Sequence, residues 1–256
     1  MMDFTVAQID ARIVALLLAL AMLASWAIGW MIGRKLPDDP EEKSAGRFVD
    51  ASLALLGLLL GFSFAMALSK HDQRRLMVIA DANGIADYYT VAGMLTDPQR
   101  KELRALVPPY METHLALVST PLNSAAAPKV IADAEKLQAQ MTHMTEEIVR
   151  AGTPVTIPLI TTLNALTSNH ISLTAALRDR LPTTVLILLA LTAVITTVLV
   201  GRYHGRKHTL QLSGTICYIA LVSLVVWAIM DLNQPTRGFI RLSTEPLERV
   251  AAGLHD

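Results

Sequence analysis

Few side chains in this sequence have the types and the spacing that chemistry requires. In the stretch YHGRKH, His204 and His208 would share one face of a helix, at a separation that metal ligands often use. Only these two ligands are present, and Arg206 and Lys207 lie between them. A basic segment at a membrane surface therefore explains the pair better than a metal site does.

The other reactive residues are scattered, and no catalytic motif joins them. The sequence contains no GxSxG, HExxH, Walker loop or dinucleotide fingerprint. The single cysteine, Cys217, lies in an apolar run, which excludes an intramolecular disulfide and a cysteine-based metal site. The remaining candidates are isolated histidines and surface acids: His71, His114, His143, His170, Asp133, Glu135, Glu146 and Glu147. We therefore predict a protein that is not an enzyme and that holds no cofactor and no metal.

The composition is that of a membrane protein. Of the 256 residues, 52% are hydrophobic and only 17% are charged, whereas a soluble domain carries about 25% charged residues. The net charge is zero, so no overall field favours nucleic acid or acidic ligands. We expect contacts with membrane lipids and none with nucleic acid.

Four apolar runs are long enough to cross a bilayer, which takes about 17–25 residues. They are residues 13–33, 51–69, 183–201 and 213–231, joined by loops at 34–50 and 202–212 and flanked by tails at 1–12 and 232–256. The first run is too long for a signal peptide and no small-residue cleavage site follows it, so we predict a retained anchor. Basic residues lie in similar numbers on the two sides, and we predict that both termini are cytoplasmic.

Residues 70–181, between the second and third spans, are too many for a simple loop. Their spaced apolar residues predict amphipathic helices after Thr96-Asp97-Pro98, at about 128–150 and at about 157–180. Pro108-Pro109 should kink or break the first of these. Because almost no alternation of period two occurs, we predict no sheet. The predicted fold class is an all-α integral membrane protein, with four transmembrane helices and a long helical extramembrane segment between the second and the third.

The second span should continue into this segment as one helix, because residues 57–89 contain no proline and no turn cluster. Small residues at intervals of four form a stripe on this span: Gly57, Gly61, Ala65 and Ser69. Such a stripe lets helices approach closely, either within one subunit or between copies around an axis. In the second case, large residues could form a hydrophobic neck that gates by dewetting. The candidates for the pore and its neck are Leu60, Phe62, Ser63, Phe64 and Leu68.

Charged residues follow the second span at once. Lys70, Arg74 and Asp81 share a helix face, which is typical either of a solvated helix with weak ion pairs or of a charged vestibule beneath a pore. Asp231, at the end of the fourth span, needs a partner, and Arg74 or Arg75 lies at a similar depth. The full set of vestibule and ion-pair candidates is Lys70, Arg74, Arg75, Asp81, Asn83, Asn164, Asp231 and Arg237.

Three stretches together resemble the bacterial bestrophin-like domain family. The first, LLGLLLGFSFAMALSKHDQRRLMVIADANGIADYY, carries Phe64, Ala67 and Arg75 and then the element Asp81-Ala82-Asn83-Gly84-Ile85. The others are LITTLNALTSNHISLTAALRDRLP, before the third span, and DLNQPTRGFIRLSTEPL, after the fourth. The matches run in order from about residue 50 to 250, so the resemblance covers most of the chain.

The resemblance implies a fold and a function. Bestrophins are pentameric ion channels whose second membrane helix lines a pore with a hydrophobic neck and extends into the cytosol. The chain would then be a multi-pass protein of the bacterial inner membrane. Its partners would be copies of itself, membrane lipids and inorganic ions. The resemblance does not specify which ion is conducted. Only Asp231 and Glu245 stand where bestrophins have an acidic calcium clasp, so calcium binding is not carried over. The alternative is a membrane-anchored sensor or scaffold whose helical segment binds a partner.

Overall fold

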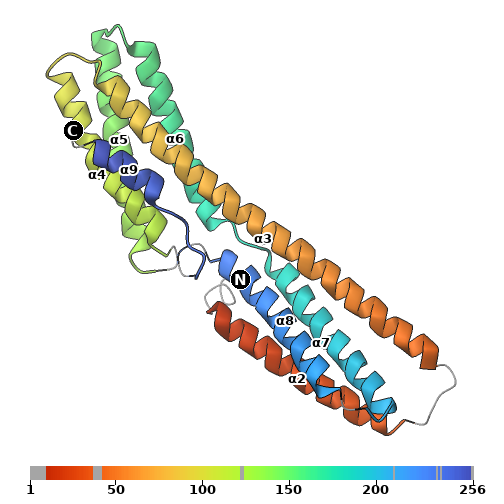
Figure 1. The fold of residues 1–256 in the computed structure, drawn as a ribbon. Coiled ribbons are helices and arrows are strands. Elements are labelled where there is room, and N and C mark those ends of the chain that lie inside the picture. Colours follow the sequence, from red (N-terminus) through yellow and green to blue (C-terminus); the bar gives the residue numbers. More distant parts are fainter. Residues whose placement is uncertain are drawn as a thin grey trace. The chain divides into compact units, whose positions relative to one another are not determined.

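The structure is a computed structural model that describes residues 10–36, 42–121, 124–209, 211–234, 236 and 238–254, without the side chains of residues 42–45. The regular elements in these ranges are helices (Figure 1): α2 (Ala11–Arg34), α3 (Glu42–Ala92), α4 (Gln99–Ser119), α5 (Ala127–Ala151), α6 (Thr156–Arg178), α7 (Thr183–Arg206), α8 (Leu212–Leu232) and α9 (Glu245–Gly253). No strand occurs among the described residues, which confirms the all-helical prediction.

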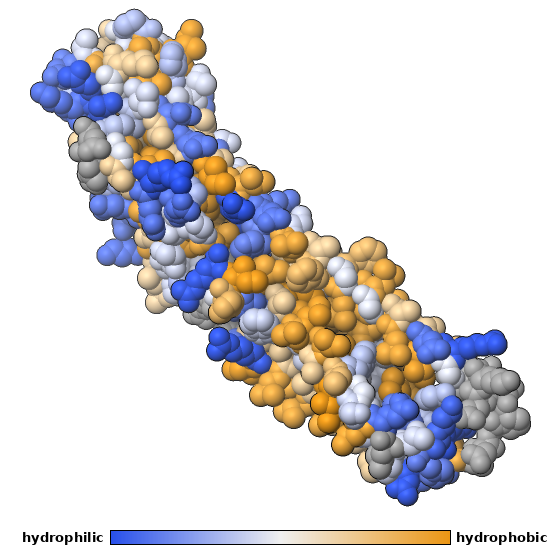
Figure 2. All heavy atoms as spheres, viewed as in Figure 1, coloured by the Kyte–Doolittle hydropathy of each residue, from blue (hydrophilic) through white to orange (hydrophobic). Residues whose placement is uncertain are grey.

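Four stretches of helix are long and apolar enough to cross a membrane: Ala11–Arg34, Gly46–Ala92, Thr156–Arg206 and Leu212–Leu232. Each contains one of the four predicted apolar runs. The third stretch comprises α6 and α7, and the predicted span at 183–201 lies within α7. In Figure 2, hydrophobic residues cover much of the visible face of α2, α7 and α8. The chain is therefore a multi-pass membrane protein.

The chain divides into two compact units. Unit 1 comprises residues 1–69 and 181–234, and unit 2 comprises residues 70–180 and 235–256. Helix α3 contributes its first part to unit 1 and its second part to unit 2. It has 51 residues, so at about 1.5 Å per residue it is far longer than a hydrocarbon layer of about 30 Å.

Helix α3 begins earlier than hydropathy predicted. Residues 42–50 were expected to belong to a loop, but they form the first turns of α3. Hydropathy marks only the apolar part of a helix, and polar residues can extend the hydrogen-bonded ladder beyond it. Further along, the residues predicted to form one helix, 57–89, lie entirely within α3.

In unit 1, α2 and α7 pack with their backbones in contact. A Cβ atom built on Gly29 would lie 2.2 Å from the carbonyl oxygen of Val198, and one built on Gly201 would lie 2.1 Å from that of Trp26. Gly33 and Gly205 repeat these contacts one turn further on, at 2.3 Å each. Both helices thus use a pair of glycines four residues apart to bring two backbones together.

Unit 2 is built on an apolar core shared by α3, α4, α5, α6 and α9. Its fully buried side chains include Ile85, Leu103, Met141, Leu166 and Leu247. These come from five different helices, so the core joins segments that are far apart in the sequence. In Figure 1, α4, α5 and α6 run alongside one another.

Two predictions about this unit are corrected. Pro108 and Pro109 do not break α4, which continues to Ser119. Each proline removes one donor from the helix, but the adjacent Val107 and Tyr110 are completely buried, and this packing holds the helix together.

The segment 232–256, predicted as a tail, contains α9. Leu247 of this helix is completely buried in the core of unit 2. The hydroxyl of Tyr89 donates a hydrogen bond of 3.1 Å to the carbonyl oxygen of Leu254. The C-terminal segment is therefore part of the folded unit.

Candidate functional site: the open face of α3 and a buried polar cluster

The small-residue stripe of α3 is open within the protomer. Gly57, Gly61, Ala65 and Ser69 are all exposed. A Cβ atom built on Gly57 or Gly61 would meet no heavy atom within 4 Å. Packing against the described residues of the same subunit therefore does not account for this stripe, and contact with another copy stays a prediction.

Four of the five neck candidates lie at least partly at the surface of the protomer. Phe62 is 61% exposed, Phe64 39% and Leu68 42%, and Leu60 is half-buried. Ser63 is only 3% exposed and lies on the buried side of α3 with Leu56 and Ala67. Phe64 and Leu68 lie one turn apart on the same face of α3, and Phe62 lies nearly opposite them. A pore lined by copies of α3 could therefore use either Phe64 with Leu68 or Phe62, whereas Ser63 is buried within unit 1.

Lys70 and Arg74 bind the end of α6 within unit 2. The ammonium of Lys70 pairs with the carboxylate of Asp179. The guanidinium of Arg74 donates to the carbonyl oxygen of Ala176 at 3.1 Å and also to that of Asp179. These carbonyls belong to the last turn and the C-cap of α6, where a helix has unsatisfied acceptors and a negative dipole end.

Arg74 is almost completely buried, at 1% exposure, whereas Arg75 beside it is exposed. Burial lowers the pKa of Arg74, while the charge of Asp179 raises it. The predicted pairing of Arg74 or Arg75 with Asp231 would join unit 2 to unit 1, and it stays a prediction. Arg237 lies outside the described residues.

The element Asp81-Ala82-Asn83-Gly84-Ile85 packs α3 against α6. The side-chain amide of Asn169 donates to the carbonyl oxygen of Ala80 at 2.8 Å. A Cβ atom on Gly84 would lie 2.7 Å from that same amide nitrogen, so a larger residue at position 84 would push Asn169 away. Asn83 of this element and Asn164 of α6 are both exposed.

Asp81 belongs to a buried chain of polar side chains from three helices. Its Oδ2 lies 2.5 Å from Nδ1 of His114, and Nε2 of His114 lies 3.2 Å from Nδ1 of His170. The exposures of Asp81, His114 and His170 are 1%, 0% and 5%. We call this set the Asp81–His114–His170 cluster. It joins α3, α4 and α6 through groups that are normally hydrated, which is costly unless they satisfy each other.

The surroundings of the cluster are apolar, and this alters its acid–base properties. Burial lowers the pKa of His170, and His114 lowers it further, while Asp81 and Glu135 act in the opposite direction. The ring of Tyr110 lies 4.2 Å from that of His114, centroid to centroid. Burial, together with the charge of Asp81, raises the pKa of the Tyr110 hydroxyl well above its usual value. Above its lowered pKa, the buried His170 ring is neutral.

Sequence reasoning placed Asp81 among vestibule residues and treated His114 and His170 as scattered. Along the sequence, His114 lies 33 residues from Asp81, and His170 lies 56 residues from His114. A local signal does exist, because His114 and His170 each fall in line with the buried apolar residues of their helices, at intervals of three or four. Burial of a histidine at such a position could have been predicted, but its partner could not.

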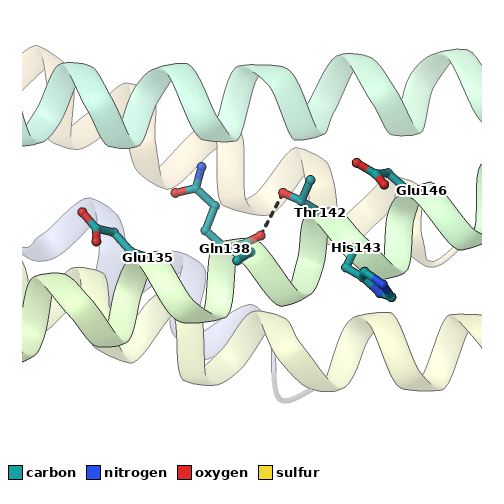
Figure 3. A pocket seen from close by; sticks show the side chains of 6 residues that line it. Glu135, Gln138, Thr142, His143 and Glu146 are labelled. Carbon is teal, nitrogen blue, oxygen red and sulfur yellow. Dashed lines mark hydrogen bonds between the residues drawn. The ribbon is translucent and has the colours of Figure 1, made fainter.

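The surface of α5 carries a shallow hollow lined by polar side chains (Figure 3). Its residues are Glu135, Gln138, Ala139, Thr142, His143 and Glu146. In Figure 3 the hydroxyl of Thr142 donates back to the carbonyl oxygen of Gln138, at 2.9 Å. Among the described residues, no group of three or more His, Cys, Asp or Glu side chains could hold a metal ion.

Residues 15–247 of the chain match the Bestrophin-like domain. The chain belongs to the Bestrophin-like domain family. The resemblance seen in the sequence is thereby confirmed. A crystal structure described as that of a membrane protein is similar to this Bestrophin-like chain at a TM-score of 0.62 and 12% identity, covering 93% of this chain and 97% of the other. At that identity the likeness shows a shared membrane-protein fold. Comparison with curated proteins gave no match.

Proposed function

We propose that this Bestrophin-like protein is a subunit of a homo-oligomeric ion channel, a pentamer as in bestrophins, in which α3 lines the pore. Unit 1 would lie in the bacterial inner membrane, and unit 2 would lie in the cytosol with both termini. Membership of the family and the likeness to a membrane-protein structure support a channel-type protein. The observation that carries the proposal is the open small-residue face of α3.

The span within α3 is less covered than the others. In its most apolar 18-residue stretch, only 17% is buried, against 28–33% for the corresponding stretches of the other three candidate spans. Lipid can cover exposed leucines, but a stripe of glycine, alanine and serine offers lipid little apolar surface and suits close contact between helices. Several α3 helices around an axis could place Phe64 and Leu68, which lie one turn apart on the same helix face, near the centre as a hydrophobic neck, with Phe62 on the other side of each helix.

Unit 2 supports the same assembly by its own exposed apolar side chains. Ile157 and Ile171 of α6 are 78% and 61% exposed, and Leu76 of α3 is 59% exposed. Helix α6 has no Asp, Glu, Lys or Arg between Thr156 and Leu177. If unit 2 lies outside the bilayer, lipid cannot cover these residues, so a second copy of the chain is the natural partner.

The first test is the oligomeric mass in detergent together with planar-bilayer recording under asymmetric salt. We expect a closed assembly of about five subunits and discrete currents with a definite reversal potential. Ile171→Glu should reduce the mass, because it places a charge in the proposed contact. Ala132→Glu, which adds the same charge at an exposed position of α5, is the matched control and should leave the mass unchanged.

A monomer or dimer with a silent bilayer would overturn the proposal. The exposed face of unit 2 would then favour a membrane-anchored scaffold. An oligomer unaffected by Ile171→Glu would instead remove α6 from the interface.

A further inference from the structure

The Asp81–His114–His170 cluster brings three titratable side chains together inside unit 2, each at most 5% exposed. The proposed ion channel gives this cluster no role. A structural role alone could be filled by apolar side chains, which would pack without the cost of burying polar groups.

With Asp81 ionised and His114 neutral, the hydrogen bonds assign a proton to one nitrogen of each ring. Asp81 has only acceptor atoms when ionised, so Nδ1 of His114 must donate to it. When His114 is neutral, its Nε2 is then an acceptor, and Nδ1 of His170 donates to it. This assignment leaves Nε2 of His170 as the free basic nitrogen of the chain.

A further proton can therefore enter at one place without breaking the chain. A proton on Nε2 of His170 leaves both hydrogen bonds intact. The added charge can stay on His170 or pass to His114 along their shared hydrogen bond. In both arrangements Nε2 of His170 carries a proton, and the charge lies on a side chain that is at least 95% removed from solvent. The partial compensation comes from Asp81 on α3 and Glu135 on α5, while Tyr110 and His114 on α4 offer no negative charge at neutral pH.

We propose that His170 is a proton-binding site, and that protonation there loosens the packing of α4 and α6 against α3. Opening of these helices exposes His170 to water, where it binds a proton more readily, so acid favours the opened form. Because α3 also carries the proposed pore face, the proton would act on the helix that the channel uses. The inference itself concerns unit 2 and does not rest on ion conduction.

The test is backbone hydrogen exchange of the purified full chain between pH 8 and pH 5, corrected for the intrinsic pH dependence of exchange. In the native protein, the equilibrium constant for opening of α4 and α6 should rise about tenfold for each unit by which the pH falls, between pH 6.5 and the lowered pKa of His170. Peptides from α2 and α7 of unit 1 serve as an internal reference and should not change in this way.

Two variants assign the effect. His170→Gln keeps a hydrogen-bond donor but cannot bind the proton, so its opening should lose the pH dependence. His143→Gln removes a histidine from the same unit whose side chain is 75% exposed, and it should behave as the native protein. A pH-independent opening in the native protein would overturn the proposal, even if His170→Gln fails to fold. Retention of the native pH dependence in His170→Gln would overturn it as well.

Discussion

Replacing Gly201 by alanine tests whether the contact between α2 and α7 sets the stability of unit 1. The new Cβ atom would lie 2.1 Å from the carbonyl oxygen of Trp26, and ordinary contact begins at about 3.4 Å. A carbonyl group inside a packed helix cannot shift by itself, so the two helices as wholes must separate by about 1.3 Å. Overpacking at the upper end of its usual range costs about 3 kcal/mol, and the better helix propensity of alanine returns about 1 kcal/mol. We expect a net destabilisation of about 2 kcal/mol.

The assay is thermal unfolding in detergent, followed by tryptophan emission. All three tryptophans, Trp26, Trp30 and Trp227, belong to unit 1, so their emission reports on this unit. Gly214→Ala is the control, because a Cβ atom there meets nothing within 4 Å, and it should raise or leave unchanged the melting temperature. If Gly201→Ala melts no lower than Gly214→Ala, the argument from backbone contact is refuted.

Three further outcomes are expected. Arg74→Met should destabilise unit 2 by about 2 kcal/mol in denaturant titration, because charged hydrogen bonds to the end of α6 are lost; exposed Arg75→Met should change little, and equal effects would contradict the assignment. Because the pKa of His170 is lowered below its unfolded value of 6.5, the stability that the neutral ring contributes is complete above pH 6.5. It should be lost as the pH falls, by up to about 1.4 kcal/mol per pH unit, and a flat profile in calorimetry would count against it. Phe64→Ala should increase single-channel conductance, because a ring of large side chains would be lost; unchanged conductance would remove Phe64 from the neck.

Some of the fold was readable from the sequence because it depends on neighbouring residues. The four apolar runs follow from the length and hydropathy of each segment. The continuity of α3 follows from the lack of a breaker between residues 57 and 89. In contrast, α4 continues through Pro108-Pro109 because burial of the neighbouring side chains outweighs a local preference.

The glycines show how far a local pattern extends. Three pairs of glycines four residues apart occur in the apolar helices: one in α3 that begins at Gly57, one in α2 that begins at Gly29 and one in α7 that begins at Gly201. Spacing predicts that each can support close packing, but it does not say which finds a partner inside the protomer. In the structure Gly29 and Gly201 meet a backbone, whereas Gly57 and Gly61 meet nothing within 4 Å.

The sequence by itself therefore determined that this is a helical membrane protein of the Bestrophin-like family, with one long helix continuing from its second apolar run. The tertiary structure decided which face of that helix is open, and it brought Asp81, His114 and His170 together. The reason is physical: hydropathy and helix formation act between residues a few positions apart. The partner of a side chain on another helix depends instead on how each helix is rotated and how far it is shifted along its axis, and the packing of the whole unit sets both.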